Sequence, residues 1–246
     1  LCTLTCKWNY LAHEQRFSHS LLDAVELTDL LSKIPSRILP PGAAVGTLSP
    51  EAAQALGLTT HVVVASGMID AHAGGVALAG AQPVGTLALI SGTSNCHMLC
   101  SEEEIHTPGV WGPYWSAMLP GYWLTEGGQS AAGALVDWTL QESGASADLY
   151  RKAEARGCHP IVLVNEWVAA LEENEAEPGR NLHVLADHHG NRSPRARPDA
   201  RGSVCGLTLE RGERQVARLY LATLQAIACG TRHIMEVMRE NGHTIS

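Results

Sequence analysis

A single carboxylate, Asp70, stands between a β-branched run, "HVVVAS" (61–66), and a segment of small residues, "AHAGGVALAG" (71–80). In α/β proteins, ligand-binding groups gather where strands end and helices begin. A carboxylate at such a junction can act as a general base if it reaches a hydroxyl proton. It can equally cap the helix that follows, because Asp is a favoured N-cap residue. The Gly and Ala run slightly favours the first interpretation, because small side chains let a ligand approach the backbone closely.

Two further segments stand at comparable junctions. Gly92, Thr93 and Ser94 lie between two strand-like runs, where a hairpin could turn backbone N–H groups and hydroxyls toward a phosphate. Tight turns use the same residue types for their own geometry, and for this segment alone that interpretation is the stronger one. Glu126 precedes a glycine pair at another strand-to-helix junction, and Gly133 would let a neighbour pack against the helix that follows. Taken alone, Glu126 is best interpreted as a partner of that helix dipole.

Histidines near Asp70 raise a metal-dependent hydrolase as an alternative. The pair Asp70 and His72 and the pair His188 and His189 could supply metal ligands. Against this, His72 stands where a helix should begin, and His188 opens a loop rich in Pro and Arg. Neither HExxH nor HxH occurs, and no GxSxG motif indicates nucleophilic catalysis. We therefore assign no metal site from the sequence.

Composition narrows the class of protein. The chain has 246 residues, of which 45% are hydrophobic and 17% charged, as is typical of a globular protein. A formal net charge of -8 argues against a nucleic-acid partner. The longest stretch without Asp, Glu, Lys or Arg, Ala71–Ser101, contains Pro83 and several Gly, which argues against a membrane span. Seven cysteines without a CxxC pattern indicate reduced thiols and a cytoplasmic protein.

Hydrophobic periodicity predicts the elements that must position these residues. The strongest helix covers 211–242, and other helices are predicted over 18–34 with Ser20 as N-cap, after the cap Ser49 up to Gly57, over 71–81, within 129–143 and within 153–179. Strands are predicted in 1–11, in 61–66 as a buried strand, on both sides of the 92–95 turn, before the glycine pair 127–128, and in 181–187 and 203–209. Helices that alternate with strands in this way predict an α/β protein with a mixed sheet.

Six segments together resemble the FGGY carbohydrate kinase family, in its ribulokinase-like branch. They are "CKW" (6–8), "GMIDAHAGG" (67–75), "ISGTSNCHM" (90–98), "GVWGPYWSAMLPGYWLTEGGQSAAGALVDW" (109–138), the region 182–207 and "LYLATLQAIACGTRHIMEVM" (219–238). Each is weak alone, but they occur in the family's order across nearly the whole chain. The resemblance implies a partial actin-like, ribonuclease-H-like α/β fold. Residues 1–82 would end a sugar-binding N-terminal domain, and 83–246 would form an incomplete ATP-binding C-terminal domain.

The resemblance also implies an activity. A family member would transfer the γ-phosphoryl group of ATP, with Mg²⁺, to a primary hydroxyl of a ketopentose similar to D-ribulose. Asp70 matches the family's general base, and Lys7 and Glu126 match polar contacts to the ketose in ribulokinases. Phosphoryl transfer depends mostly on positioning and charge neutralisation, so one such carboxylate is sufficient. The small residues after Asp70 would then leave room for sugar and phosphate.

The remaining matches concern the nucleotide. Thr93 matches the residue of the phosphate hairpin that meets the transferred group, with Gly92 and Ser94 beside it, and Gly133 matches a glycine near the nucleotide. Glycerol kinases carry Gln four residues after that glycine, whereas this chain has Asp137. The family's D-x-G-T loop and its adenosine motif are absent, and the chain does not begin with Met. We therefore expect a fragment that by itself binds ATP weakly and does not phosphorylate sugar.

Two alternatives remain open at this point. One is a non-catalytic sugar-binding or partner-binding protein derived from the kinase fold, and the intact Asp70 argues against it. The other is the metal-dependent hydrolase described above. The expected partners are a small sugar and ATP, without nucleic acid or membrane, and the resemblance allows a homodimer.

Overall fold

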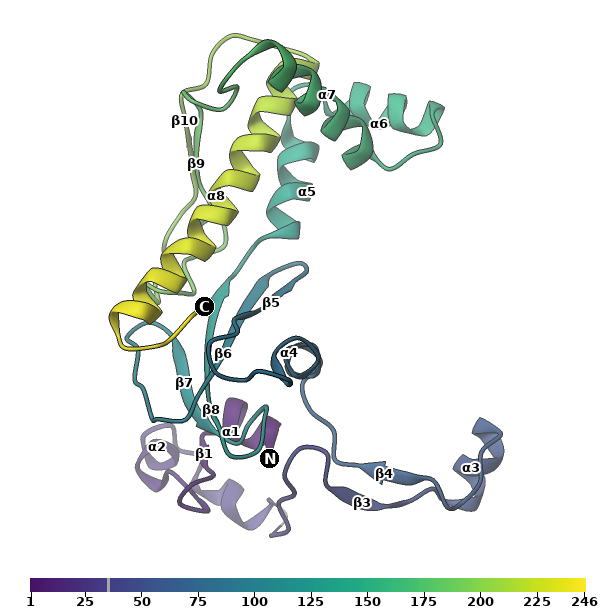
Figure 1. Ribbon diagram of the computed structural model, residues 1–246, viewed down its shortest axis with the longest axis vertical. Coiled ribbons are helices and arrows are strands. Elements are labelled where there is room, and N and C mark those ends of the chain that lie inside the picture. The colour runs from purple at the N-terminus through teal and green to yellow at the C-terminus, as the bar shows by residue number, and fades with distance from the viewer. Residues whose placement is uncertain (35) are drawn as a thin grey trace.

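A four-stranded antiparallel sheet lies near the middle of the molecule, in the spatial order β5-β6-β8-β7 (Figure 1). The structure is a computed structural model that describes residues 1–34 and 36–246. The strands are β5 Ala88–Ser91, β6 Asn95–Ser101, β7 Trp111–Trp115 and β8 Trp123–Gln129. β6 and β8 pair along their whole lengths, so β8 places its residues in a fixed register at the centre of the sheet.

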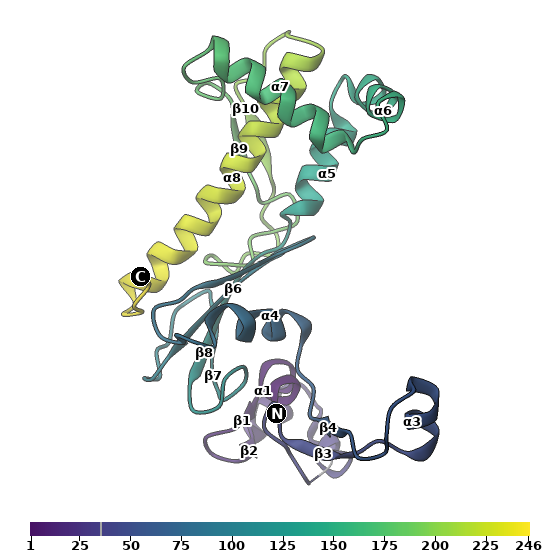
Figure 2. The same cartoon turned by 45° about the vertical axis from the view of Figure 1, so that its right-hand side comes forward.

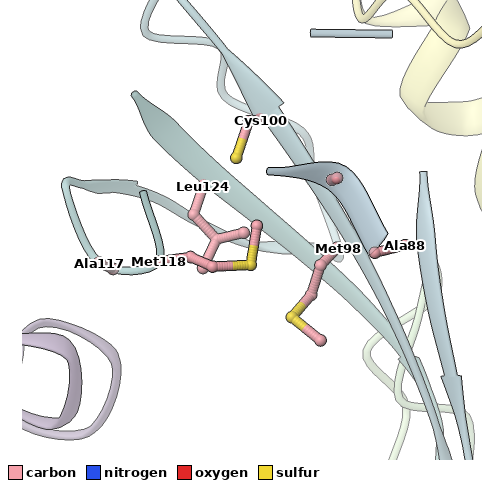
Figure 3. Packing of buried hydrophobic residues seen from close by; sticks show 7 residues of the cluster. Ala88, Met98, Cys100, Ala117, Met118 and Leu124 are labelled. Atoms are coloured by element: carbon pink, nitrogen blue, oxygen red, sulfur yellow. The ribbon is translucent and has the colours of Figure 1, made fainter. Parts of the chain in front are cut away.

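The two faces of this sheet pack against different helices. Successive side chains of a strand point to opposite faces. Met98 of β6 packs in a core that includes residues of α4 (Asp70–Ala79), as the cluster in Figure 3 shows in part. The next residue, Leu99, packs instead with Ile234 of α8 (Glu213–Glu240). The sheet therefore separates an α4 side from an α8 side.

The other elements lie toward the two ends of the molecule (Figure 2). On one side of the sheet are α1 Cys2–Trp8, β1 Tyr10–Leu11, β2 Arg16–Phe17, α2 His19–Ala24, the 3₁₀ helix η1 Thr28–Ser32, β3 Ala44–Thr47, α3 Pro50–Leu56 and β4 Val63–Ala65. On the other are α5 Gly133–Glu142, α6 Ser146–Ala155, α7 Pro160–Asn174, β9 His183–Leu185 and β10 Ser203–Cys205. No helix among the described residues is both long enough and apolar enough to cross a bilayer.

Several predicted elements are confirmed. Ser49 caps α3 by accepting a hydrogen bond from the N–H of Ala52, and Gly57 ends that helix with a left-handed φ of 65°. The hairpin formed by β5 and β6 has the predicted turn, with Ser91 paired to Asn95. α4 and α8 also form where their patterns predict helices.

The N-terminal predictions are wrong in two places. Residues 1–11 were expected to contain a strand, because apolar residues alternate with Thr, but they begin with the helix α1. Burial of Cys2 and Thr5 on one face of α1 shows that tertiary packing overrides the alternating pattern. The helix predicted over 18–34 has Ser18 rather than Ser20 as its N-cap residue, and it ends at Ala24. Glu26, between α2 and η1, has a positive φ of 57°, which does not fit an α-helix, so the helix does not continue into η1.

The predicted sheet differs from the observed one in three respects. The strand in 61–66 forms as β4 but is exposed rather than buried: 61% of Val63 is accessible. The four-stranded sheet is antiparallel rather than mixed, and parallel pairing occurs in single bridges such as Val84–Cys100. β7 was not predicted, and the glycine pair 127–128 lies inside β8 rather than after it.

The hairpin is joined to the start of α5 through backbone hydrogen bonds. The carbonyl of Gly92 accepts from the N–H of Gly133 at 2.9 Å, and the carbonyl of Thr93 accepts from Ala132 at 2.9 Å and Ala134 at 3.2 Å. These N–H groups have no partner within their own helix, so the hairpin satisfies them. A Cβ atom at Gly133 would lie 2.6 Å from the Gly92 carbonyl oxygen. Glycine at 133 is therefore required by the backbone of the hairpin.

We predict that Gly133→Ala lowers the free energy of unfolding by about 1–3 kcal/mol, because the added methyl must push the hairpin away. Urea denaturation followed by circular dichroism measures this. Gly144→Ala is the matched control, since no atom lies within 4 Å of its Cβ position. Equal stability of the two variants would contradict the proposed contact.

A buried histidine makes stability depend on pH. His97 of β6 is inaccessible, and its Nε2 lies 3.0 Å from the hydroxyl of Thr231 on α8. Burial lowers the pKa of His97 from 6.5 to about 4. The unfolded chain therefore binds a proton that the folded chain does not bind between these two values. Stability is full above pH 6.5 and is lost as the pH falls toward 4.

We predict that the chain loses about 2 kcal/mol of stability through His97 alone between about pH 7.5 and about pH 5. His97→Gln should reduce the difference between urea-unfolding free energies at the two pH values by that amount. His106→Gln, which changes an exposed histidine, is the control and should leave the difference unchanged. A pH difference that His97→Gln does not alter would refute the assignment.

Candidate active site

The predicted sugar-site residues converge on the α4 side of the sheet. Lys7 lies at the end of α1, Asp70 is the first residue of α4, and Glu126 lies in the middle of β8. α1, α4 and β8 lie next to one another in both views (Figures 1 and 2). Glu126 lies 3.6 Å from the ring of His72 on α4, and Cys6, the neighbour of Lys7 on α1, lies 3.7 Å from the same ring nitrogen. The structure thus brings α1, α4 and β8, which are far apart in the sequence, to one buried histidine.

Asp70 is exposed at the N-terminus of α4. Its Oδ1 accepts a hydrogen bond from the N–H of Ala71 at 2.8 Å. The cap position of the helix belongs to Ile69, which makes no side-chain cap bond, so Asp70 is not the N-cap. A helix N-terminus is a favourable place for negative charge. The carboxylate is therefore accessible, and it is oriented by the helix that it begins.

Glu126 is buried, with 7% of the residue accessible, and it faces His72. Its Oε2 lies 3.6 Å from Nε2 of His72, and the same nitrogen lies 3.7 Å from Sγ of Cys6. Burial lowers the pKa of His72, the negative charge of Glu126 partly offsets this, and Lys7 adds to the lowering. The ring of His72 is consequently neutral at neutral pH, and it is a buried polar group in contact with Glu126.

Three residues close to Glu126 or His72 were not predicted as members of this site. Cys6 was quoted only within "CKW", Cys96 was not placed near a charged group, and Tyr114 lies on the unpredicted strand β7. Burial raises the pKa of the Cys96 thiol, and Glu126 raises it further. Burial also raises the pKa of Tyr114 to about 12, with a contribution from Glu126. The i,i+4 spacing of Cys2 and Cys6 is a sequence signal that could have placed Cys6 on the same helix face as Cys2.

The small residues of α4 serve the packing of the helix. A Cβ atom at Gly74 would lie 2.9 Å from Cδ1 of Ile90, and one at Gly75 would clash with Sδ of Met118. These small residues were predicted to leave room for sugar and phosphate. At these two glycines the space is instead filled by the side chains of Ile90 on β5 and of Met118 between β7 and β8, so the expectation is corrected there.

The predicted phosphate hairpin is exposed at its tip. Gly92 and Thr93 are accessible and Ser94 is half-buried. The N–H of Gly92 donates to the carbonyl of Ser94 at 3.0 Å, so this N–H is used within the turn and is not directed at a phosphate. A Cβ atom at Gly92 would meet nothing closer than the Ser94 carbonyl at 4.0 Å. The tip therefore has open space in front of it.

The residues of the hydrolase alternative do not assemble. His188 follows β9, and its ring lies 4.9 Å from the ring of Trp138 on α5, away from the α4 side of the sheet. Within residues 1–34 and 36–246, the group of three side chains that could hold a metal ion consists of Cys2, Cys6 and His72. It includes neither Asp70 nor His188. The arrangement required for that hydrolase is therefore not found in the described part of the chain.

Comparison with known proteins gives three results that agree. The C-terminal domain of the FGGY family of carbohydrate kinases matches residues 87–246. An FGGY carbohydrate kinase domain-containing protein of Homo sapiens is 46% identical over all of this chain and 48% of its own length. A D-ribulokinase of Saccharomyces cerevisiae is 32% identical over all of this chain and 40% of its own length. The chain thus spans about half, or less, of the length of these relatives.

A solved structure agrees with the fold. The xylulose kinase of Rhodospirillum rubrum superimposes with a TM-score of 0.63 and 24% identity, over 89% of this chain and 41% of that chain. At this identity the likeness concerns the fold, and it confirms the predicted partial actin-like α/β architecture. Together with the match over 87–246, it establishes that the chain belongs to the FGGY family of carbohydrate kinases.

Proposed function

We propose that this protein phosphorylates a primary hydroxyl of a ketopentose, D-ribulose or a close analogue, with ATP as donor. The observation that carries the proposal is the contact of Glu126 on β8 with His72 on α4, at 3.6 Å, two residues after Asp70 and 3.7 Å from Cys6, the neighbour of Lys7. Support comes from the relatives, one of which is named a D-ribulokinase. Other structures with this fold are named xylulose and gluconate kinases, so the choice of sugar depends on the residues of the site.

In this proposal Asp70 is the general base. Its exposed carboxylate takes the proton of the sugar hydroxyl as the hydroxyl oxygen attacks the γ-phosphorus and the bond to ADP breaks. The hydrogen bond from Ala71 orients the carboxylate, and the positive end of α4 stabilises it as an anion. A positioned base of this kind typically contributes about 10²–10⁴-fold to the rate.

Lys7 and Glu126 then select the sugar. Lys7 donates hydrogen bonds and Glu126 accepts them, so a polyhydroxylated substrate finds both kinds of partner. Glu126 is buried, and leaving a buried carboxylate without a hydroxyl partner is costly. A site built in this way discriminates strongly against substrates that lack the matching hydroxyl.

The nucleotide phosphates are assigned to the tip of the hairpin formed by β5 and β6. Gly92, Thr93 and Ser94 would meet the transferred phosphoryl group, and Gly133 would act through its contact with Gly92 rather than by touching the nucleotide. Mg²⁺ prefers oxygen ligands and is usually carried by substrate phosphates. We therefore assign the ion to the phosphates of ATP, where it would neutralise phosphate charge and leave the carboxylate of Asp70 free as the base.

Residues 1–82 are assigned to the sugar-binding domain and 83–246 to the ATP-binding domain. The 246-residue chain by itself is still expected to bind ATP weakly. A non-catalytic sugar-binding protein is the second candidate, and the experiments below separate it from a kinase.

We predict that Asp70→Asn in the full-length protein lowers kcat by about 10²-fold or more and leaves sugar affinity largely intact. Coupled detection of ADP release measures kcat, and calorimetry measures sugar binding. Asp29→Asn removes another exposed carboxylate, on η1, and serves as the control. Turnover near that of the unmodified protein in Asp70→Asn would exclude Asp70 as the base. An unmodified protein that binds sugar without releasing ADP would support the non-catalytic candidate.

We predict that Glu126→Gln and Lys7→Ala each raise the KM for D-ribulose by at least about tenfold, because each removes a charged partner of a sugar hydroxyl. Steady-state kinetics with a panel of ketopentoses, ketohexoses and glycerol provides the test. Lys33→Ala, which removes an exposed lysine of an i,i+4 pair, is the control. The assignment fails if glycerol is the best substrate or if neither variant changes the KM.

A further inference from the structure

A second group of chemically active side chains lies directly beside the sugar-site residues. Cys2 and Cys6 are one helical turn apart on α1, and His72 comes from α4. Their ligand atoms, two Sγ atoms and a ring nitrogen, all lie within 4.8 Å of one another. Cys2 is inaccessible, and His72 is 1% exposed. The proposed phosphoryl transfer uses none of these three side chains.

The distances among these atoms approach those of a tetrahedral zinc site. Zinc bonds of about 2.3 Å to sulfur and about 2.0–2.1 Å to nitrogen imply ligand-to-ligand separations of about 3.3–3.8 Å. Nε2 of His72 lies 3.7 Å from Sγ of Cys6, within this range. Nε2 also lies 3.6 Å from Oε2 of Glu126. Glu126 does not belong to the group of atoms within 4.8 Å of one another, so its carboxylate must move toward the two sulfurs to become a fourth ligand.

The local chemistry favours a soft cation. Two sulfur ligands and one imidazole suit Zn²⁺ or Cd²⁺ and not Mg²⁺, which requires oxygen ligands. The ring of His72 uses Nε2 for its polar contacts, and its buried Nδ1 has no hydrogen-bond partner among the described residues. The Sγ atoms of Cys2 and Cys6 lie within 4.8 Å of each other. On binding, the two thiol protons would leave to solvent and the sulfurs would bind as thiolates.

We propose that Cys2, Cys6 and His72 form a binding site for a thiophilic divalent cation, with Zn²⁺ as the biological representative and Glu126 as its fourth ligand. The ion occupies the space between α1, α4 and β8. It differs in chemistry from the Mg²⁺ that would accompany ATP, because Mg²⁺ prefers oxygen ligands.

The shared carboxylate gives the site a consequence for catalysis, which rests on the proposed function. A carboxylate oxygen bound to the cation is no longer free to accept a hydrogen bond from a sugar hydroxyl. The cation and the sugar therefore compete for Glu126. Zn²⁺ should raise the KM for D-ribulose with little effect on kcat, and a chelator should reverse the effect.

Cadmium binding tests the site without any use of kinase activity. Cd²⁺ added to the reduced, full-length protein should produce the ultraviolet charge-transfer absorption of a Cd–thiolate bond, with one ion bound tightly per chain. Mg²⁺ at about 10 mM, an excess of at least about tenfold over Cd²⁺, should leave this absorption unchanged. Failure to observe the absorption would overturn the proposal.

Variants locate the site. Loss of an outer-shell partner typically weakens metal binding by about 10–100-fold. Cys6→Ser and His72→Gln each remove a direct ligand, so each should weaken Cd²⁺ binding by at least as much. Cys229→Ser removes an exposed cysteine on α8 and is the matched control with the same number of thiols. Loss of the absorption in Cys229→Ser, or full retention in both Cys6→Ser and His72→Gln, would overturn the proposal. Circular dichroism checks that each variant is folded.

Glu126→Gln separates the two levels of the inference. It should retain the Cd–thiolate absorption, because both thiols remain, but bind the ion more weakly. If Cd²⁺ binds as expected while Zn²⁺ leaves the KM for D-ribulose unchanged, the metal site stands and the role of Glu126 in sugar binding fails. If Zn²⁺ raises the KM but the absorption is absent, inhibition arises elsewhere and the metal site is rejected.

Discussion

The close approach of α4 to the sheet is the contact on which the site depends. Gly74 and Gly75 bring this helix against Ile90 and Met118, where larger residues would hold it away. Because the helix lies so close, its first turn brings His72 against Glu126 on β8, with Asp70 two residues earlier at the exposed start of the helix. A side chain at either glycine would therefore move the proposed base and the buried ring together. The glycines act on the chemistry through position, without touching a ligand.

The central strands distribute their residues between two tasks. On β8, Glu126 faces His72 on the α4 side, and the next residue, Gly127, faces Ile234 on the α8 side. The period of two in a strand thus places a polar group in the site and a space for packing directly behind it. On β6, His97 reaches Thr231 of α8 in the same way. The chemistry on one face is supported by close packing on the other.

Several elements that carry the candidate site were predictable from the sequence, and the packing around them was not. The hairpin at 92–95, the caps of α3 and the helices α4 and α8 follow from local signals, namely turn residues, capping residues and periodicity. α1 was missed because alternating Thr and apolar residues favour a strand locally, whereas burial of Cys2 and Thr5 decides for a helix. The meaning of Gly133 was also out of reach. Only the fold shows that the Gly92 carbonyl, and not a ligand, occupies the space beside it.

The length of α8 has a mechanical meaning. Its 28 residues correspond to a rod of about 42 Å. Near its start, Val216 and Tyr220 belong to the core formed with α5, α6 and α7, and near its end, Ile234 and Met238 belong to the core beneath the sheet. One stiff element is thus clamped at both ends by separate cores (Figure 1). Over this length a tilt of about 5° at the helical end would displace the sheet end by about 4 Å, so α8 couples the positions of the two cores.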